Sequence, residues 1–408
     1  MNSAKRTIGA AAIVLMMLAV SQAFAQDWPQ WRGPGRDGKV AGFKAPDVWP
    51  KELTQKWKVT VGAGDAAPVL VAGKLYVFAR QGEDEVTLCL NAETKEELWR
   101  DKYPVATIPG PSARQHAGPR GTPAVAEGKV VTLGVTGVLS CLDAANKGKL
   151  LWRKDEIKGT PKYFTGTSPI IVEGLAIAQL GGEDAGVIVA YDLATGNEKW
   201  KCPGRGSAYA SPVLAAVEGV KQLVTLTNKN VVGIALADGK PLWEVPFPSQ
   251  GMVYNAATPI VDGSTVIFTG QGRGTKAVKI EKKGDGFAAT ELWSNPLGTQ
   301  FCSPVLKDGM LYGISDKGNL FCINAKSGET VWADSTKLGN YGAMLDAGST
   351  ILALPNNSQL LAFKPGEKQY VELAKLKVAE TPTFACPVVA GNNIFVKDQD
   401  ALILWTLN

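Results

Sequence analysis

Residues 138–153, VLSCLDAANKGKLLWR, carry the pattern that decides the fold. An apolar run leads into Asp143, then come polar residues and a glycine, and a second run ends in Trp152. Apolar runs on either side of an Asx- and Gly-containing turn are typical of two antiparallel strands. The same pattern recurs as VTLCLNAETKEELWR (86–100), VIVAYDLATGNEKWK (187–201) and NLFCINAKSGETVWA (319–333).

Each repeat also begins with a shared signal. A small residue, usually with proline after it, precedes a short apolar run, and successive signals lie about 40 to 55 residues apart, the spacing of propeller blades. In the first repeat, LVAGKLYVFAR (70–80) is typical of a strand, a glycine turn and a second strand. Each unit should therefore form four short antiparallel strands. The eight signals start at Ala67, Thr122, Ser168, Ser211, Thr258, Ser303, Ala343 and Cys386.

One such sheet cannot bury both of its faces, whereas a ring of sheets can. The sequence therefore predicts an all-β fold, an eight-bladed β-propeller over residues 53–408. The eighth unit reaches the C-terminus after its third strand. LTQKWKVTVG (53–62) is a candidate for the missing strand, with Trp57 in register. We expect this N-terminal strand to complete the last blade and close the ring.

Tryptophan usually ends the fourth strand, and Tyr370 takes its place in the seventh unit. We interpret these tryptophans as structural side chains that pack between blades, each with its N–H on a nearby carbonyl. They are Trp57, Trp99, Trp152, Trp200, Trp243, Trp293 and Trp332.

The first 25 residues are typical of a secretory signal peptide. Lys5 and Arg6 precede an apolar run over residues 8–20, and AFA (23–25) is a cleavage signal. The run is too short to span a bilayer, and no later stretch reaches the roughly 18 apolar residues that a membrane helix needs. The first cysteine is Cys89, so no lipid-attachment site lies near the cut. We expect a periplasmic or secreted, monomeric protein without a stable membrane anchor, cleaved near Ala25.

Charge and side-chain content exclude several functions. The net charge of +5, or +3 without Lys5 and Arg6, is small and evenly spread, which argues against nucleic-acid binding. The chain has one histidine, His116, and no C-x-x-C motif, so we predict no metal site and no catalytic residues. Two roles remain open for His116: a hydrogen bond to the backbone of its Gly- and Pro-rich loop, or a polar group that reaches the channel mouth.

The cysteines do not form the pattern of a disulfide framework. Cys89, Cys141 and Cys322 occupy one repeat position, where blades should hold them too far apart to bridge. Cys302 and Cys386 share another position, and Cys202 stands alone. We expect small buried side chains and at most one bridge.

The recurring LDAxTGxxxW run with its S-P-V start resembles the pyrroloquinoline-quinone (PQQ)-like repeat, and the resemblance covers nearly all of residues 53–408. The chain most resembles exported members of that family that open with a WPQWRGP-type segment (28–34) and carry a GPRGTP turn (118–123). The resemblance implies a propeller. It also implies, for the quinoprotein dehydrogenases of the family, a quinone in the central channel, a calcium ion, an aspartate base and two adjacent cysteines.

This chain has no adjacent cysteines, and the family's calcium ligands and base match no positions here. We therefore expect no cofactor. A PQQ- and calcium-dependent dehydrogenase of alcohols or sugars is the runner-up.

The first strand of each blade should line the central channel, so the residues three positions before each proline should meet at one mouth. Four of these eight are aromatic, and Asp65 and Arg120 lie on neighbouring blades, where they could pair. We predict a ligand or partner surface here, with His116; the alternative is that the aromatics only pack the loops. The positions are Asp65, Arg120, Gly166, Tyr209, Ala256, Phe301, Tyr341 and Phe384.

Residues 26–52 precede the closing strand and cannot belong to a blade. Prolines 29 and 34 stiffen this segment and its glycines let it turn. We expect Trp28 and Trp31 to dock it on the propeller, across a channel mouth or the edge of the last blade, with Arg32 and Arg36 paired to carboxylates. The alternative is a free peptide that serves a partner.

Taken together, these features predict a non-catalytic binding or scaffold module. The nearest functional analogues by repeat are the barrel-assembly propellers of the BamB type, which bind protein partners. A polysaccharide-binding propeller is the third possibility, which the aromatic positions would suit.

Overall fold

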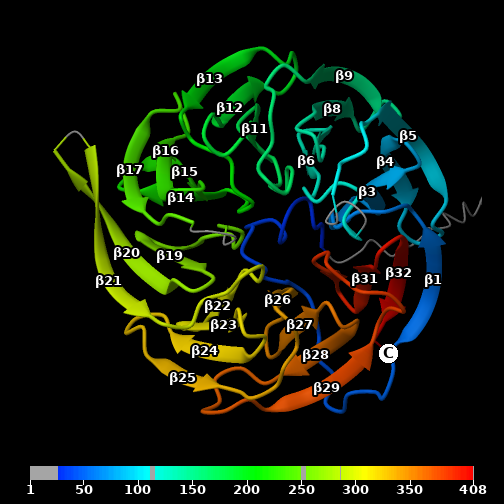
Figure 1. Ribbon diagram of the computed structural model, residues 1–408. Helices are drawn as coiled ribbons and strands as arrows, with labels where there is room; N and C mark the ends of the chain where they lie inside the picture. Colours follow the sequence, from blue (N-terminus) through cyan, green and yellow to red (C-terminus); the bar gives the residue numbers. More distant parts are fainter. Residues whose placement is uncertain (1–25, 111–114, 250–253, 285, 408) are drawn as a thin grey trace, which may run out of the picture.

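The computed structural model describes residues 26–110, 115–249, 254–284 and 286–407, and the expected signal peptide, residues 1–25, lies outside them. Within the described residues the chain forms eight four-stranded antiparallel sheets, arranged around a central channel as an eight-bladed β-propeller (Figure 1). The predicted fold is therefore confirmed. No described helix is long and apolar enough to cross a membrane.

Each of the first seven blades runs from an inner strand to an outer strand in sequence order. Blade 1 contains β2 (Val69–Val71), β3 (Lys74–Gln81), β4 (Asp84–Asn91) and β5 (Glu97–Pro104). Blade 2 contains β6 (Ala124–Ala126), β7 (Lys129–Leu133), β8 (Leu139–Asp143) and β9 (Lys149–Lys154). Blade 3 contains β10 (Ile170–Val172), β11 (Leu175–Leu180), β12 (Val187–Asp192) and β13 (Glu198–Pro203). Blade 4 contains β14 (Val213–Val217), β15 (Val220–Leu226), β16 (Asn230–Ala235) and β17 (Pro241–Pro246).

The second half of the ring repeats this plan. Blade 5 contains β18 (Ile260–Asp262), β19 (Thr265–Gly270), β20 (Gly274–Lys283) and β21 (Gly286–Asn295). Blade 6 contains β22 (Val305–Lys307), β23 (Met310–Ile314), β24 (Leu320–Asn324) and β25 (Thr330–Ala333). Blade 7 contains β26 (Gly342–Asp346), β27 (Ile351–Pro355), β28 (Gln359–Phe363) and β29 (Glu372–Lys377). Blade 8 contains β30 (Val388–Ala390), β31 (Asn393–Lys397), β32 (Ala401–Thr406) and β1 (Thr54–Thr60).

The ring closes as the sequence predicts. Strand β1 pairs antiparallel with β32, and Trp57 faces Leu404. The last blade thus combines β1 with three strands from the C-terminal part of the chain, and β1 and β32 lie side by side in Figure 1. Because the closing strand comes from the far end of the sequence, the ring cannot open without breaking a strand ladder.

A bulge lies opposite the outer-strand tryptophans and shapes the blades. In blade 2, Cys141 pairs with Trp152 and the next pair is Leu142 with Leu150, so one residue is left over. The same shift recurs in blade 1 after Cys89 and in blade 6 after Cys322. A bulge bends its strand and increases the local twist. Cys141, Cys89 and Cys322 are therefore small, buried residues that pair with the tryptophan next to the bulge. All six cysteines of the chain are buried and free of disulfide bonds.

The tryptophans connect neighbouring blades. Trp152 donates its indole N–H to the carbonyl of Leu193 in blade 3 at 3.0 Å, and its ring packs on Gly196 of the same turn. Equivalent indole-to-carbonyl bonds join Trp200 to Leu236, Trp293 to Ala325 and Trp332 to Glu367. Trp99 packs its ring on Gly148 of blade 2. Trp243 and Trp57 depart from the expected pattern.

Trp243 bonds the side-chain oxygen of Gln222 within its own blade rather than a carbonyl of the next blade. The Trp57 indole nitrogen is buried and has no hydrogen-bond partner among the described residues. Within its own blade, the Trp57 ring packs at a tilt on Phe395, with ring centroids 5.9 Å apart.

Candidate functional site

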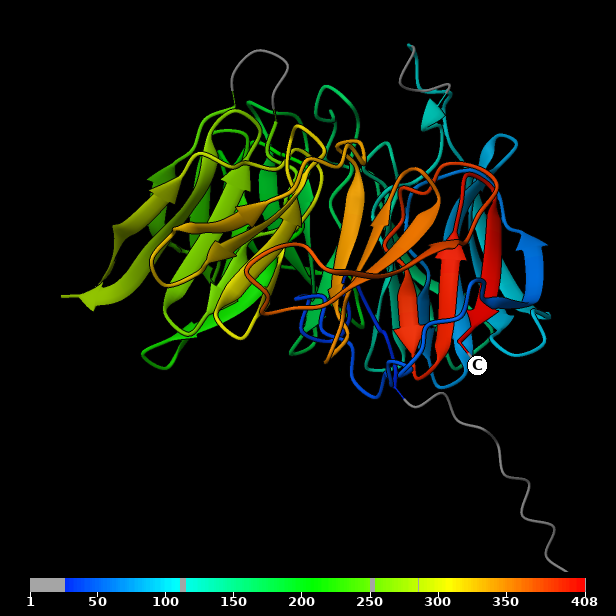
Figure 2. The same ribbon diagram turned by 90° about the horizontal axis from the view of Figure 1, so that it is seen from below.

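The N-terminal segment, residues 26–52, lies across one face of the ring. In Figure 2 its first part, in dark blue, passes beneath the blades. Trp28 forms an antiparallel bridge with Leu70 of blade 1, and the Pro29 carbonyl accepts a bond from Val125 of blade 2. At the other side Val40 donates to Asp346 of blade 7. The segment therefore reaches from blade 1 across the channel to blade 7.

Its arginines contact the central strands from inside the channel. Arg32 donates to the carbonyls of Ser303 and Pro304 in blade 6, both at 2.7 Å. Arg36 donates to those of Ser168 and Pro169 in blade 3. The expectation that these arginines pair with carboxylates is wrong, because the inner strands present unpaired backbone carbonyls to the channel.

Both guanidinium groups are almost completely buried, with exposed fractions of 3% for Arg32 and 2% for Arg36. Desolvation lowers the pKa of both, that of Arg36 to about 9. Trp31 completes the contact by donating its indole N–H to Thr258 of blade 5 at 2.8 Å. Residues 28–40 thus form a plug in the channel.

Above the plug the channel widens into a cavity of about 270 Å³. Trp31 and Arg32 lie among its lining residues, so the plug contributes directly to its wall. The other lining residues come mainly from the loops that enter the inner strands. The structure places every residue of the predicted channel-mouth surface in this lining: Asp65, His116, Arg120, Tyr209, Phe301, Tyr341 and Phe384.

Aromatic rings succeed one another around the cavity. Tyr209 lies 5.1 Å from Tyr254, Tyr254 lies 5.7 Å from Phe301, and Phe301 stacks on Tyr341 at 3.9 Å between ring centroids. Tyr341 meets Phe384 edge to face at 5.0 Å, and Phe384 meets the imidazole of His116 at 4.7 Å. We call this set, with Tyr163 beside Tyr209 and Tyr254, the aromatic belt.

Tyr163 and Tyr254 were missed by the sequence reasoning. They precede Gly166 and Ala256, the two blade entries where the position three residues before the proline is small. At one of these entries the small residue leaves space for the neighbouring ring, since a Cβ on Gly166 would lie 3.2 Å from the Tyr209 ring. A tyrosine two or three residues upstream of a small entry residue was the signal that would have found them.

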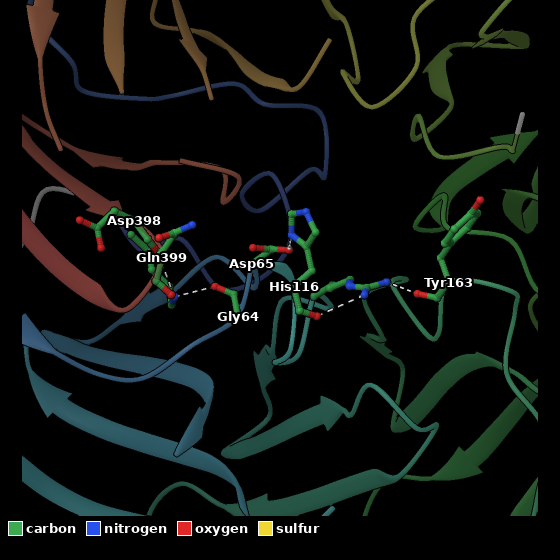
Figure 3. Close-up of polar contacts among 8 residues, drawn as sticks. Gly64, Asp65, His116, Tyr163, Asp398 and Gln399 are labelled. Carbon is green, nitrogen blue, oxygen red and sulfur yellow. Dashed lines mark hydrogen bonds and ion pairs between the residues drawn. The ribbon is translucent and has the colours of Figure 1, made fainter. Parts of the chain in front are cut away.

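The polar part of the cavity lies at the entries to blades 1 and 2. Asp65 Oδ2 lies 2.6 Å from His116 Nδ1, and both side chains are mostly buried (Figure 3). Arg120 donates to the carbonyl of Tyr163 and, at 3.2 Å, to that of His116. The expected pair of Asp65 with Arg120 is therefore wrong, because His116 reaches the carboxylate and Arg120 turns to backbone carbonyls.

Burial shapes the ionisation of these groups. Desolvation lowers the pKa of Arg120, and the nearby Asp65 opposes that shift. Desolvation also raises the pKa of Tyr209, Tyr254 and Tyr341 above the usual value for tyrosine. At neutral pH the tyrosine hydroxyls are therefore neutral. A guanidinium group keeps its proton in proteins, so Arg120 is a cation.

A buried lysine supports the loop that carries Asp65. Lys397, 1% exposed, donates to the carbonyl of Gly64 at 2.6 Å and to those of Asp398 and Gln399. Figure 3 shows the carbonyl of Gly64 beside this contact and Asp65 next to it. Desolvation lowers the pKa of Lys397 to about 8. Lys397 thus ties the closing blade to the loop that positions the Asp65 carboxylate.

The fold and the site define a class, the propellers built from PQQ-like repeats, as the sequence predicts. A family model described as "Outer membrane protein assembly factor BamB" matches residues 36–201 and 110–334. The chain belongs to this family.

Relatives and solved structures agree with this assignment. The chain is 23% identical to outer membrane protein assembly factor BamB of Burkholderia pseudomallei, covering 86% of each chain. It is 28% identical to that of Xanthomonas campestris pv. campestris, over 70% of this chain and 80% of the relative.

Among solved structures, BamB from Moraxella catarrhalis superposes with a TM-score of 0.65 at 13% identity, covering 87% of this chain and 97% of the other. Quinohemoprotein alcohol dehydrogenase from Comamonas testosteroni superposes with a TM-score of 0.69 at 14% identity, covering 93% of this chain and 80% of the other. These structural likenesses show the shared fold.

The calcium ion of the dehydrogenases does not fit the residues present. Calcium needs six to eight oxygen ligands, carboxylates prominent among them. Asp65 is the only carboxylate in the described lining, and His116 already holds it. No group of three His, Cys, Asp or Glu side chains in the described chain could hold a metal ion. We therefore derive no chemical step through a quinone.

Proposed function

We propose that this protein is an exported, non-catalytic propeller that binds another protein through the face on which the cavity opens. Membership in the family of outer membrane protein assembly factors supports a role in protein assembly. The signal-peptide pattern of residues 1–25 supports a periplasmic location after cleavage near Ala25.

The plug is the observation that supports binding of the partner on the opposite face of the ring. It occupies the channel from one side with two buried arginines and a bonded indole. That face is therefore already used by the chain itself, whereas the opposite mouth remains open to the cavity. Binding and assembly sites on propellers are built from loops on a rigid ring, and the loops around this mouth present aromatic and charged side chains.

Site-specific photo-crosslinking in the native host tests this proposal. A photoreactive amino acid replaces exposed Lys162 or Asp184. Lys162 precedes the cavity residue Tyr163, and Asp184 follows Glu183, whose carboxylate accepts a hydrogen bond from the Lys162 backbone N–H. We expect both positions to crosslink to one defined protein, identified by mass spectrometry.

Asp308 is the matched control. It is equally exposed, in the turn between β22 and β23, and the equivalent turn of blade 1 contacts Asp27 of the N-terminal segment. Crosslinks from Asp308 alone, or from no position while the exported protein is folded, would contradict docking on the cavity face.

A further inference from the structure

The cavity is closed at one end, which limits what can enter it. Trp31 and Arg32 lie in its wall and bond to blades 5 and 6 across the channel. A polymer cannot thread through, so a ligand must present an end or a protruding group. The volume of about 270 Å³ lies just below the roughly 300–1,000 Å³ of ordinary ligand pockets, enough for one ring with its attached polar group.

The lining favours a flat apolar ring. The belt brings together phenyl, phenol and imidazole rings in stacked and edge-to-face contacts, from 3.9 Å for Phe301 with Tyr341 to 6.5 Å for Tyr163 with Tyr209. A further aromatic ring placed among them gains burial and the same ring-to-ring attraction. In the described part of the chain, no group hydrogen-bonds the Tyr341 hydroxyl, so it is available as a donor.

The charge of the lining favours an anion. Among its described residues the cavity has two guanidinium groups, Arg32 and Arg120, and one carboxylate, Asp65, which is paired with His116. Arg32 is held by carbonyls below the belt. Among the described residues Arg120 makes two hydrogen bonds, each from a different terminal nitrogen, and each terminal nitrogen of a guanidinium carries a second N–H. Two N–H groups on the terminal nitrogens of one guanidinium bind a carboxylate best, because each N–H can donate to one carboxylate oxygen.

We propose that the cavity binds the C-terminal aromatic residue of a polypeptide, with its ring in the aromatic belt and its α-carboxylate on Arg120. This inference rests on the proposed function and names the part of the partner that the open face receives. A chain end is the one place on a polypeptide where a carboxylate and an aromatic side chain are carried by the same residue. A neutral sugar would use the belt but leave the charge of Arg120 unmatched.

The test is fluorescence anisotropy with a labelled pentapeptide, Gly-Ser-Gly-Ser-Phe, titrated with the mature protein. We expect saturable binding of the free acid and about tenfold or greater loss when the C-terminus is an amide, because the charge-assisted hydrogen bonds are lost. Replacing the terminal Phe by Ala should also weaken binding roughly tenfold, because the buried ring is removed. Both comparisons use the unmodified protein, so no variant has to fold.

Variants then locate the site. Arg120→Gln should weaken the acid about tenfold and leave the amide unchanged, whereas Arg100→Gln, an exposed arginine on outer strand β5, should change neither. Tyr341→Ala should weaken both peptides, and Tyr341→Phe should restore most of the binding. Thermal unfolding of each variant confirms that the ring is intact.

Three results would overturn the inference: equal binding of acid and amide, no saturable binding of either peptide, or displacement of the bound peptide by cellohexaose, which would assign the belt to a sugar chain. The proposed function fails separately. If crosslinks from Lys162 and Asp184 still identify one protein, the partner docks on this face without inserting its C-terminus.

Discussion

Asp65 and His116 pair through their side chains at the entries to blades 1 and 2, with 2.6 Å between Oδ2 and Nδ1. The imidazole of His116 also stacks on Tyr341 at 6.2 Å and meets Phe384 edge to face. One side chain thus connects the polar and aromatic parts of the cavity. Because His116 holds the carboxylate of Asp65, Arg120 donates its hydrogen bonds to backbone carbonyls instead of to Asp65.

The strength of this pair can be measured by a double-mutant cycle. Asp65→Asn and His116→Phe, alone and together, should give a coupling of about 1 kcal/mol in the free energy of unfolding, because the pair is part-buried. The matched cycle uses the exposed pair of Asp84 with Lys102, 2.8 Å apart, and should give less than about 0.5 kcal/mol. Equal couplings in the two cycles would mean that His116 is held by packing alone.

Limited proteolysis tests the plug. Trypsin should cleave the folded protein after exposed Lys44 or Lys51 and spare the bonds after Arg32 and Arg36, whose side chains are almost completely buried. Mass spectrometry of the first fragments distinguishes the sites. Rapid trimming after Arg32 would show that the segment is a free peptide, the alternative that the sequence left open.

The contact between blades can be tested at Gly196. A Cβ at this position would lie 2.7 Å from Trp152 Cγ, and the backbone has φ of 73°. Gly196→Ala should therefore cost about 2–3 kcal/mol in urea unfolding, from steric overlap added to backbone strain. Gly174→Ala is the control, because its φ of 71° is nearly the same and a Cβ there meets nothing within 4 Å. If both variants lose the same stability, the tryptophan contact contributes little.

Lys397 should make stability depend on pH. Its pKa is lowered to about 8 in the folded protein, below the usual 10.5 of the unfolded chain. Between these values the unfolded state binds more protons than the folded state, so stability rises with pH. From pH 7 to 9.5 the folded protein should gain about 2 kcal/mol relative to Lys397→Met, which removes this group and leaves the other titrations in place. A pH-independent difference between the two proteins would contradict the lowered pKa.

The strands and the ring could be predicted because their signals are local and repeated. Each turn of the type DLATG (192–196) fixes a hairpin within a few residues, and the eightfold recurrence leaves one architecture that buries all the sheets. Closure by β1 was also predictable, since a unit with three strands needs a fourth.

The partners inside the channel could be predicted only in part. The positions of Tyr209, Phe301 and Phe384 could be derived from their fixed offset to the inner strands. The hydrogen-bond partners of Arg32 and Arg36 could not be predicted, because every residue has a backbone carbonyl and the sequence does not distinguish one carbonyl from another. Loop geometry also decides the partner of Asp65, and the length of the loop before Arg120 is what brings His116 to it.

A titration with PQQ separates this chain from the dehydrogenases that share its fold. The resemblance to those enzymes implies a quinone bound together with a calcium ion. In this chain Asp65 is the one carboxylate in the described lining, and it is already paired with His116. Calorimetry of the mature protein with PQQ should therefore give the same result with and without calcium. Trp31, in the cavity wall, gives a second readout through its fluorescence. Saturable binding that requires calcium would revive the dehydrogenase, and alcohols and sugars would then be tested with an electron acceptor.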